Sequence, residues 1–224
     1  MTAPSERHDD ARYSDVLLFP NLAELRRRLP PLLGGILGIG VGIGLSVRAE
    51  LGLAPWDVLH QGLSKTTNIS IGLIVILVGA VVLLAWLPLR QKLGIGTVIN
   101  ALSIGFVADA TIAVVPHVHL LVVRGALFLT ALLCFGFGGG LYIGAGLGPG
   151  PRDGLMTAIT ARGFTLWKVR TAIELSALAV GFALGGGVGA GTIVLAVALG
   201  PLTHFALRRF HLPVHAGTQE VLGE

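Results

Sequence analysis

The stretch Leu51–Leu63 reads LGLAPWDVLHQGL and follows directly after a long apolar segment. It recurs in part at Leu147–Leu155, which reads LGPGPRDGL. The two stretches lie about 96 residues apart, and a constant offset of this kind is the signature of an internal repeat. When residues 40–59 are aligned with residues 136–155, about half of the positions are identical, whereas a Gly- and Leu-rich composition alone would give roughly two matches. Pro and Asp are among the matches, so the chain contains two related copies of one unit.

A second pair of segments continues the repeat. The run GIGT at Gly94–Thr97 recurs as GAGT at Gly189–Thr192, now at an offset of about 95 residues. One residue has therefore been lost between the two matched blocks, and each copy extends over most of one half of the chain.

The composition is that of a membrane protein. The chain is 53% hydrophobic and only 12% charged, whereas a soluble domain carries about twice that charge. Uncharged runs near the spanning length of about 20 residues recur along it. The single Cys134 lies within such a run, which excludes a disulfide framework and a Cys-based metal site. The basic residues cluster beside apolar runs, where they orient a membrane protein, so we expect no nucleic-acid partner.

These patterns predict an all-α, polytopic bundle of six spans, with a short interfacial or re-entrant helix after each copy of the motif. Pro and Asp near the start of a segment favour such a helix. We expect a polar N-terminal arm over 1–29 with a surface helix from 16, a first three-span repeat over 30–115, a second over 121–210, and a polar tail over 211–224. The expected spans are about 31–47, 71–89, 97–115, 126–147, 169–187 and 191–207, and the expected short helices are about 56–65 and 152–162.

Three spans per copy have a consequence for orientation. Because an odd number of crossings separates the copies, the second enters the membrane from the opposite side, and a pseudo-two-fold axis in the membrane plane relates the halves. With both termini inside, three of the 16 Lys and Arg residues fall outside, namely Arg48, Lys65 and Arg124. That asymmetry agrees with the positive-inside rule, so we expect both termini to be cytoplasmic.

The run GLAPWDVLHQGL at Gly52–Leu63, followed by GIGT at Gly94–Thr97 and then by Gly105 and Asp109, resembles the YczE/YitT-type family of bacterial integral membrane proteins. The resemblance is closest to the YczE branch and covers about residues 32–207. Ala54 stands where this family would have Gly. The resemblance implies a multi-pass protein of the bacterial inner membrane. It implies no reaction, and no catalytic residue is carried over.

Polar residues inside spans are candidates for function, because they are costly in lipid unless paired or hydrated. Two stripes of small residues each end in an ionisable group, Asp109 and His204. One hypothesis is that these two residues approach the midplane from opposite sides and line a polar site. The alternative is a local role, in which Asp109 bonds a neighbouring hydroxyl or backbone amide and His204 a carbonyl.

The two motif loops are further candidates, because interrupted segments at matching positions of inverted halves indicate a transporter's binding site. One hypothesis is that their short helices aim positive N-terminal ends at an anion, with Arg152 adding charge. Asp57 and Asp153 argue against a simple anion site, because they already occupy those ends, and the alternative is that they are helix caps in structural turns. We expect Trp56 to be an interfacial anchor and Glu174 to pair with Arg170 on one helix. The ligand or path-lining candidates are Asp57, His60, Gln61, Thr97, Asn100, Asp109, Arg152, Asp153, Thr192 and His204.

The leading functional hypothesis is a small-solute or ion transporter whose path runs between the two halves, with one half rocking against the other. The alternative is a membrane accessory or regulatory protein that binds a partner protein through helix contacts. No zinc-protease or serine-nucleophile motif occurs, so we expect no enzyme activity, no catalytic or metal-binding residue and no cofactor. The expected partners are the lipid bilayer with a small solute, an ion or a membrane protein. A polar cavity at the centre would favour transport, and a dry centre the accessory role.

Overall fold

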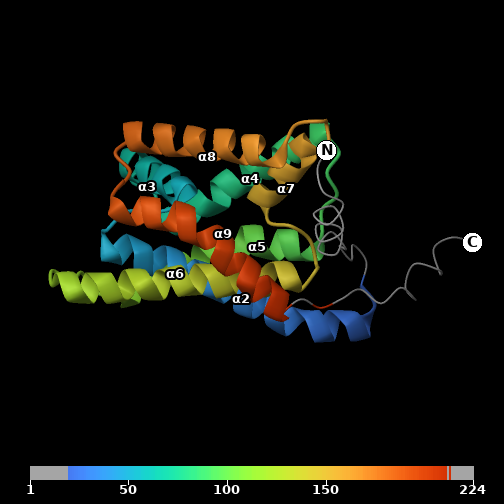
Figure 1. The fold of residues 1–224 in the computed structure, drawn as a ribbon, viewed down its shortest axis with the longest axis horizontal. Coiled ribbons are helices and arrows are strands. Elements are labelled where there is room, and N and C mark those ends of the chain that lie inside the picture. Colours follow the sequence, from blue (N-terminus) through green and yellow to red (C-terminus); the bar gives the residue numbers. More distant parts are fainter. Residues whose placement is uncertain (1–19, 211, 213–224) are drawn as a thin grey trace, which may run out of the picture.

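The computed structural model describes residues 20–210 and Leu212, and within them the chain is helical without a strand (Figure 1). Most of the predicted tail and the first part of the predicted surface helix lie outside the described residues. In chain order the helices are α2 (Leu22–Ala49), α3 (Pro55–Thr67), α4 (Ile71–Leu89), α5 (Ile95–Val114), α6 (Leu121–Gly144), α7 (Pro151–Thr160), α8 (Leu166–Ala183) and α9 (Ala190–Phe210).

Five of these helices, α2, α4, α5, α6 and α9, are long and apolar enough to cross a membrane. Large apolar side chains on them remain exposed, such as Phe106, Val122 and Val197, as expected where lipid covers the protein. The chain is therefore a multi-pass membrane protein. The predicted fifth span corresponds to α8, which is not among the five because Lys168, Arg170 and Glu174 interrupt its 18 residues.

The N-terminal part of the fold corrects the prediction. In place of a surface helix that ends at residue 29 and a separate span, α2 is one helix that continues through Pro30 and Pro31. A proline inside a helix removes one backbone hydrogen bond and usually breaks or bends the helix. Here Arg28 is fully buried beside the prolines and donates a 2.9 Å hydrogen bond to the carbonyl of Ala145. This tertiary contact fixes the segment against the rest of the protein and outweighs the local preference.

The helices form two bundles, and each bundle takes helices from both sequence copies. In the first bundle α2 packs against α5 and α6, and α6 packs against α9. In the second bundle α3 packs against α8, and α7 packs against α4. Figure 1 shows α3, α4, α7 and α8 above and α2, α5, α6 and α9 below. The contact between α4 and α5 joins the bundles, so the division in space does not follow the division of the sequence.

Glycines allow the closest approach of the two central helices. A Cβ added at Gly35 would lie 2.6 Å from the carbonyl oxygen of Gly138, and one at Gly38 would lie 3.0 Å from the Cα of the same residue. Only glycine permits backbones to pack at this distance, as is common between membrane helices. The contact between α2 and α6 thus relates the first helix of one copy to the first helix of the other.

The two motif loops make matching hydrogen bonds. The amide of Gly191 donates to the carbonyl of Leu51, and the amide of Gly96 donates to the carbonyl of Leu147, each at 2.8 Å. Each loop is therefore attached to the first turn of the last helix of the other copy. These bonds also satisfy backbone groups that would be costly to leave unpaired within a membrane protein.

Replacing Gly148 by Ala should destabilise the protein. Gly148 has φ +123°, and an added Cβ would meet the Thr97 hydroxyl oxygen at 2.6 Å. Such strain costs about 1–3 kcal/mol, so we expect a lower midpoint of thermal unfolding in detergent. Gly125→Ala is the matched control, because a Cβ at Gly125 meets nothing within 4 Å. Equal midpoints for the two variants would contradict the described loop geometry.

Candidate functional site

A cavity of about 230 Å³ is lined by residues from both bundles. All eight described helices contribute to its walls. At the liquid-water packing of ~30 Å³ per molecule, it has room for roughly eight waters or a ligand with about as many non-hydrogen atoms. Because all of these helices border it, this cavity is the candidate site.

The two motif helices begin at this cavity. Pro55 and Pro151 are the first residues of α3 and α7, and both line it. Proline suits the first helical turn because its backbone has no N–H that would need a partner. Ala54 and Gly150, which precede them, have extended backbones and provide no side-chain cap. Two positive helix ends are therefore directed toward one space. The predicted short helices over 56–65 and 152–162 are confirmed, each within two residues at either end.

The cavity has a polar wall and an apolar wall. The polar wall consists of Trp56, Arg152, Asp153, Arg170 and Glu174, all from α3, α7 and α8. The apolar wall comes from α2, α4, α5 and α9. Its aliphatic side chains are Ile39, Ile43, Val75, Val78, Val82, Ala101, Ile104, Leu195, Ala196 and Leu199.

Behind the polar wall, charged groups connect the two motifs. Asp57 and His60 are buried, and the His60 Nδ1 lies 3.4 Å from the Asp57 Oδ1. The Arg152 Nη2 lies 3.8 Å from the same Asp57 oxygen and 3.4 Å from each ring nitrogen of His60. The Arg152 guanidinium carbon is 5.0 Å from the Trp56 ring centroid, within the range of a cation–π interaction. Gln61, in contrast, accepts a 2.6 Å hydrogen bond from the loop before α9.

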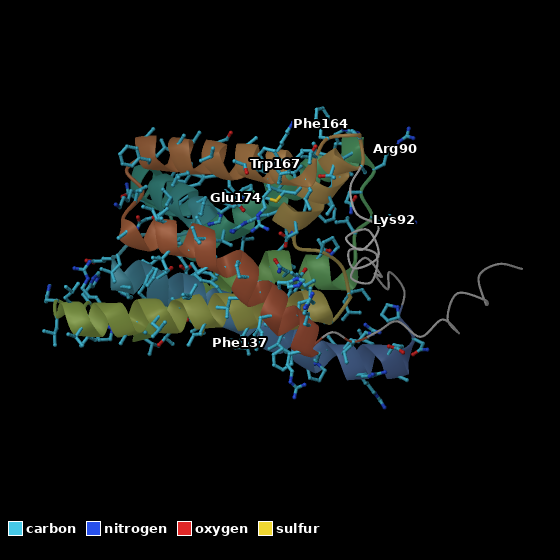
Figure 2. All side chains as sticks on the ribbon, viewed as in Figure 1. Arg90, Lys92, Phe137, Phe164, Trp167 and Glu174 are labelled. Atoms are coloured by element: carbon cyan, nitrogen blue, oxygen red, sulfur yellow. The ribbon has the colours of Figure 1, made fainter. Side chains whose placement is uncertain are left out.

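The predicted pair on α8 is confirmed. The Arg170 Nε donates a 2.9 Å hydrogen bond to the Glu174 Oε1. Figure 2 shows Glu174 on the side of α8 that faces the other helices. Both residues line the cavity, although their spacing on one helix had suggested only a local role.

Asp153 differs from the other acidic residues of the site. It lines the cavity, its side chain is exposed, and no Lys, Arg or His nitrogen of the described residues lies within 4.0 Å of its carboxylate. Asn100, another predicted candidate, lines the same cavity from α5. The Tyr142 hydroxyl, close by, donates a 2.9 Å hydrogen bond to the carbonyl of Gly148.

Two predicted threonines support the motif loops. The Thr97 hydroxyl donates a 2.7 Å hydrogen bond to the carbonyl of Pro149. The Thr192 hydroxyl accepts a 3.2 Å hydrogen bond from the amide of Gly189. Both side chains are buried and neither lines the cavity. They contribute by fixing the loops, not by contacting a ligand.

Asp109 and His204 do not line the cavity. Asp109 accepts hydrogen bonds from the Ser70 hydroxyl at 2.6 Å and from the amide of Gly72 at 2.7 Å. It therefore caps the start of α4, which is the local role that the sequence left open for it. His204 is exposed on α9.

Sequence reasoning missed Trp56, Tyr142, Arg170 and Glu174 as lining residues. Trp56 was expected at the membrane interface, but it lies at the cavity with its indole nitrogen buried. One available signal was its position beside the proline that begins α3. A second was the occurrence of two ionisable residues, Arg170 and Glu174, within a predicted span.

Comparisons with known proteins support the resemblance in the sequence. Residues 26–208 match a family of unknown function, DUF6198. An uncharacterized protein of Haemophilus influenzae is 39% identical over 78% of this chain and 83% of its own. The uncharacterized membrane protein YczE of Bacillus subtilis is 32% identical over 77% of this chain and 82% of its own. No solved structure matches.

Asp57→Asn should destabilise the protein more than Glu174→Gln. Removing the Asp57 charge leaves Arg152 without its carboxylate, which should cost about 2 kcal/mol; a fully buried pair would lose more, but Arg152 is 32% exposed. The Arg170–Glu174 pair is more exposed and contributes about 0.5 kcal/mol. Thermal unfolding of both variants in detergent checks the difference, and a larger loss for Glu174→Gln would contradict it.

Proposed function

We propose that this chain, which belongs to the family of unknown function DUF6198, is a small-solute or ion transporter of the bacterial inner membrane. The observation that carries the proposal is the central cavity, where two interrupted segments from different sequence copies meet among charged side chains. Interrupted helices that aim their ends at a central site are a recurring feature of secondary transporters.

We further propose six spans arranged as two inverted repeats. The matched hydrogen bonds of Gly191 with Leu51 and of Gly96 with Leu147 support this arrangement. So does the reciprocal packing, in which each motif helix contacts the second span of the other copy. The charges of α8 do not argue against a sixth span, because Arg170 and Glu174 line the cavity. A polar site inside the protein removes those charges from lipid.

For the orientation, we propose that both termini are cytoplasmic. Figure 2 shows Arg90, Lys92 and Phe164 at the same end of the molecule, so the loops after α4 and α7 lie together. Arg152 and Arg170 line the cavity, so they are not counted among the basic residues in loops that orient the chain in the membrane. The basic residues that begin α2 and end α9 remain to orient the chain by the positive-inside rule.

The proposed motion differs from the rocking of one sequence half against the other. Because both bundles are built from both halves, we propose that one bundle moves against the other across the cavity. The contact between α4 and α5 joins the bundles on one side, whereas the corresponding helices α8 and α9 are not in extended contact. The joined side would act as the hinge. We propose no catalytic step, and no contact among residues 20–210 favours the accessory role.

Single cysteines at Lys65 and Arg162 should label from opposite sides of the membrane. Both residues are exposed at the ends of the two motif helices, and inverted repeats place those ends on opposite faces. The variants are Lys65→Cys and Arg162→Cys in a Cys134→Ser background, probed in right-side-out and inverted vesicles with a membrane-impermeant maleimide. Labelling of both from one side would exclude the inverted repeat.

Filling the cavity should stop transport. A Cβ added at Gly79 would lie 4.0 Å from its nearest neighbour, Ala101, so Gly79→Leu extends into the cavity without a backbone clash. Gly125→Leu is the matched control, because nothing lies within 4 Å and Gly125 does not line the cavity. The measurement is uptake of small amines, amino acids and inorganic ions by proteoliposomes. We expect flux in the natural protein and in Gly125→Leu and its loss in Gly79→Leu. Absence of flux for every solute would count against the transporter proposal.

A further inference from the structure

The charges on the cavity wall and directly behind it pair off with one exception. Arg152 lies beside Asp57 at 3.8 Å, and Arg170 is hydrogen-bonded to Glu174 at 2.9 Å. Asp153 lines the cavity with an exposed side chain and has no such partner among the described residues. When the paired charges cancel, with Asp57 counted behind the wall, one negative charge remains, and that charge is on Asp153.

The place of this charge favours a cationic ligand. A carboxylate inside a membrane protein is costly unless a counter-charge or a hydrogen-bond donor satisfies it. Arg152 and Arg170 act on Asp153 only through space, since each already contacts another carboxylate. An entering cation would make the direct contact with the Asp153 carboxylate that Arg152 and Arg170 do not make. An anion would instead have to displace Asp57 or Glu174 from its partner.

The opposite wall indicates the kind of cation. Apart from Asn100 it consists of aliphatic side chains such as Ile43, Val82 and Leu199, so it offers a metal ion no more than one amide group. A metal ion requires several oxygen, nitrogen or sulfur ligands. An ammonium group on a short apolar body needs one carboxylate for its charge and an apolar surface for the remainder. The volume of about 230 Å³ limits such a ligand to about eight non-hydrogen atoms at ~30 Å³ each.

We propose that the cavity binds a small amphipathic organic cation, with the Asp153 carboxylate against its ammonium group and the aliphatic wall against its apolar body. This inference rests on the proposed function, because it names the class of solute for the same site. It places the specificity of the site on Asp153, while Asp57, His60 and Arg152 hold the start of α7 in position behind it.

Three probes with the same six-carbon chain test the inference: hexylammonium, hexanol and hexanoate. Isothermal titration of the purified protein in detergent, with protein-free micelles as blank, measures their binding. A charge-assisted hydrogen bond contributes enough that hexylammonium should bind at least about tenfold more tightly than hexanol. Hexanoate should bind more weakly than both. Equal or tighter binding of hexanoate would overturn the inference, as would hexylammonium binding no better than hexanol.

Variants assign the effect to Asp153 and to the cavity. Asp153→Asn, which keeps the shape of the side chain, should abolish the preference for hexylammonium over hexanol. Asp109→Asn is the matched control, because Asp109 caps α4 outside the cavity wall; it should retain the preference. Gly79→Leu should remove binding of all three probes and so separates cavity binding from partition into micelles. A preference that survives Asp153→Asn would overturn the assignment, and so would binding that survives Gly79→Leu.

Failure of this inference and failure of the proposed function are distinguishable. Binding of hexylammonium without flux of any solute would support the cation site and count against transport. Flux of other solutes that Gly79→Leu abolishes, without preference for hexylammonium, would support transport and overturn the cation site.

Discussion

The structure depends on a reciprocal constraint: each motif loop is held by the other copy. The carbonyls of Leu51 and Leu147 accept hydrogen bonds from Gly191 and Gly96, at the starts of α9 and α5. Chain that leaves a helix inside a membrane protein must satisfy its backbone groups within the protein. These bonds do so, and they place the beginnings of α3 and α7 at one cavity. Without these two hydrogen bonds, the interrupted segments would bring unpaired backbone groups into the bundle, which is unfavourable.

The charges at the centre follow from this placement. Asp57 and Arg152 come from different copies of the motif and lie 3.8 Å apart because both helix starts reach the same place. The motif is conserved between the copies at Pro and Asp, but Trp56 and Arg152 occupy the same position after the proline. The guanidinium of one lies over the ring of the other. The position at which the copies differ therefore contributes the contacting pair at the site, while the shared Pro and Asp residues form the matching helix starts around it.

Much of the fold could be predicted from the sequence. Apolar runs and helix-starting prolines located most elements, and the predicted range of α4 agrees with the structure at both ends. The continuation of α2 through Pro30 and Pro31 could not be predicted, because it depends on the distant contact of Arg28 with Ala145. The exchange of helices between bundles also depends on contacts far apart in the chain.

The candidate site was predictable only in part, for a similar reason. Motif position made Arg152 and Asp153 candidates, and the structure places both on the cavity wall. Spacing along a helix suggested a stripe that ends in Asp109, but spacing does not say which neighbour a stripe contacts. The structure gives that neighbour as the start of α4. For Arg170 and Glu174 the local pairing was correct, yet a pair on one helix can also face a cavity. A sequence pattern does not distinguish the two.

The mixed bundles have a consequence for biosynthesis. When the ribosome has released the first copy, α3 has not yet met α8, and Asp57 has not yet met Arg152. Until the second copy has been inserted, Asp57 has only His60 of its own helix beside it and lacks the charge of Arg152. Since a charge without a counter-charge is disfavoured in lipid, we expect the nascent segment to stay near water or protein during that interval. Completion of the bundle is thus a late event that requires nearly the whole chain, and a chain that stops after α5 lacks helices against which its α2, α3 and α4 pack.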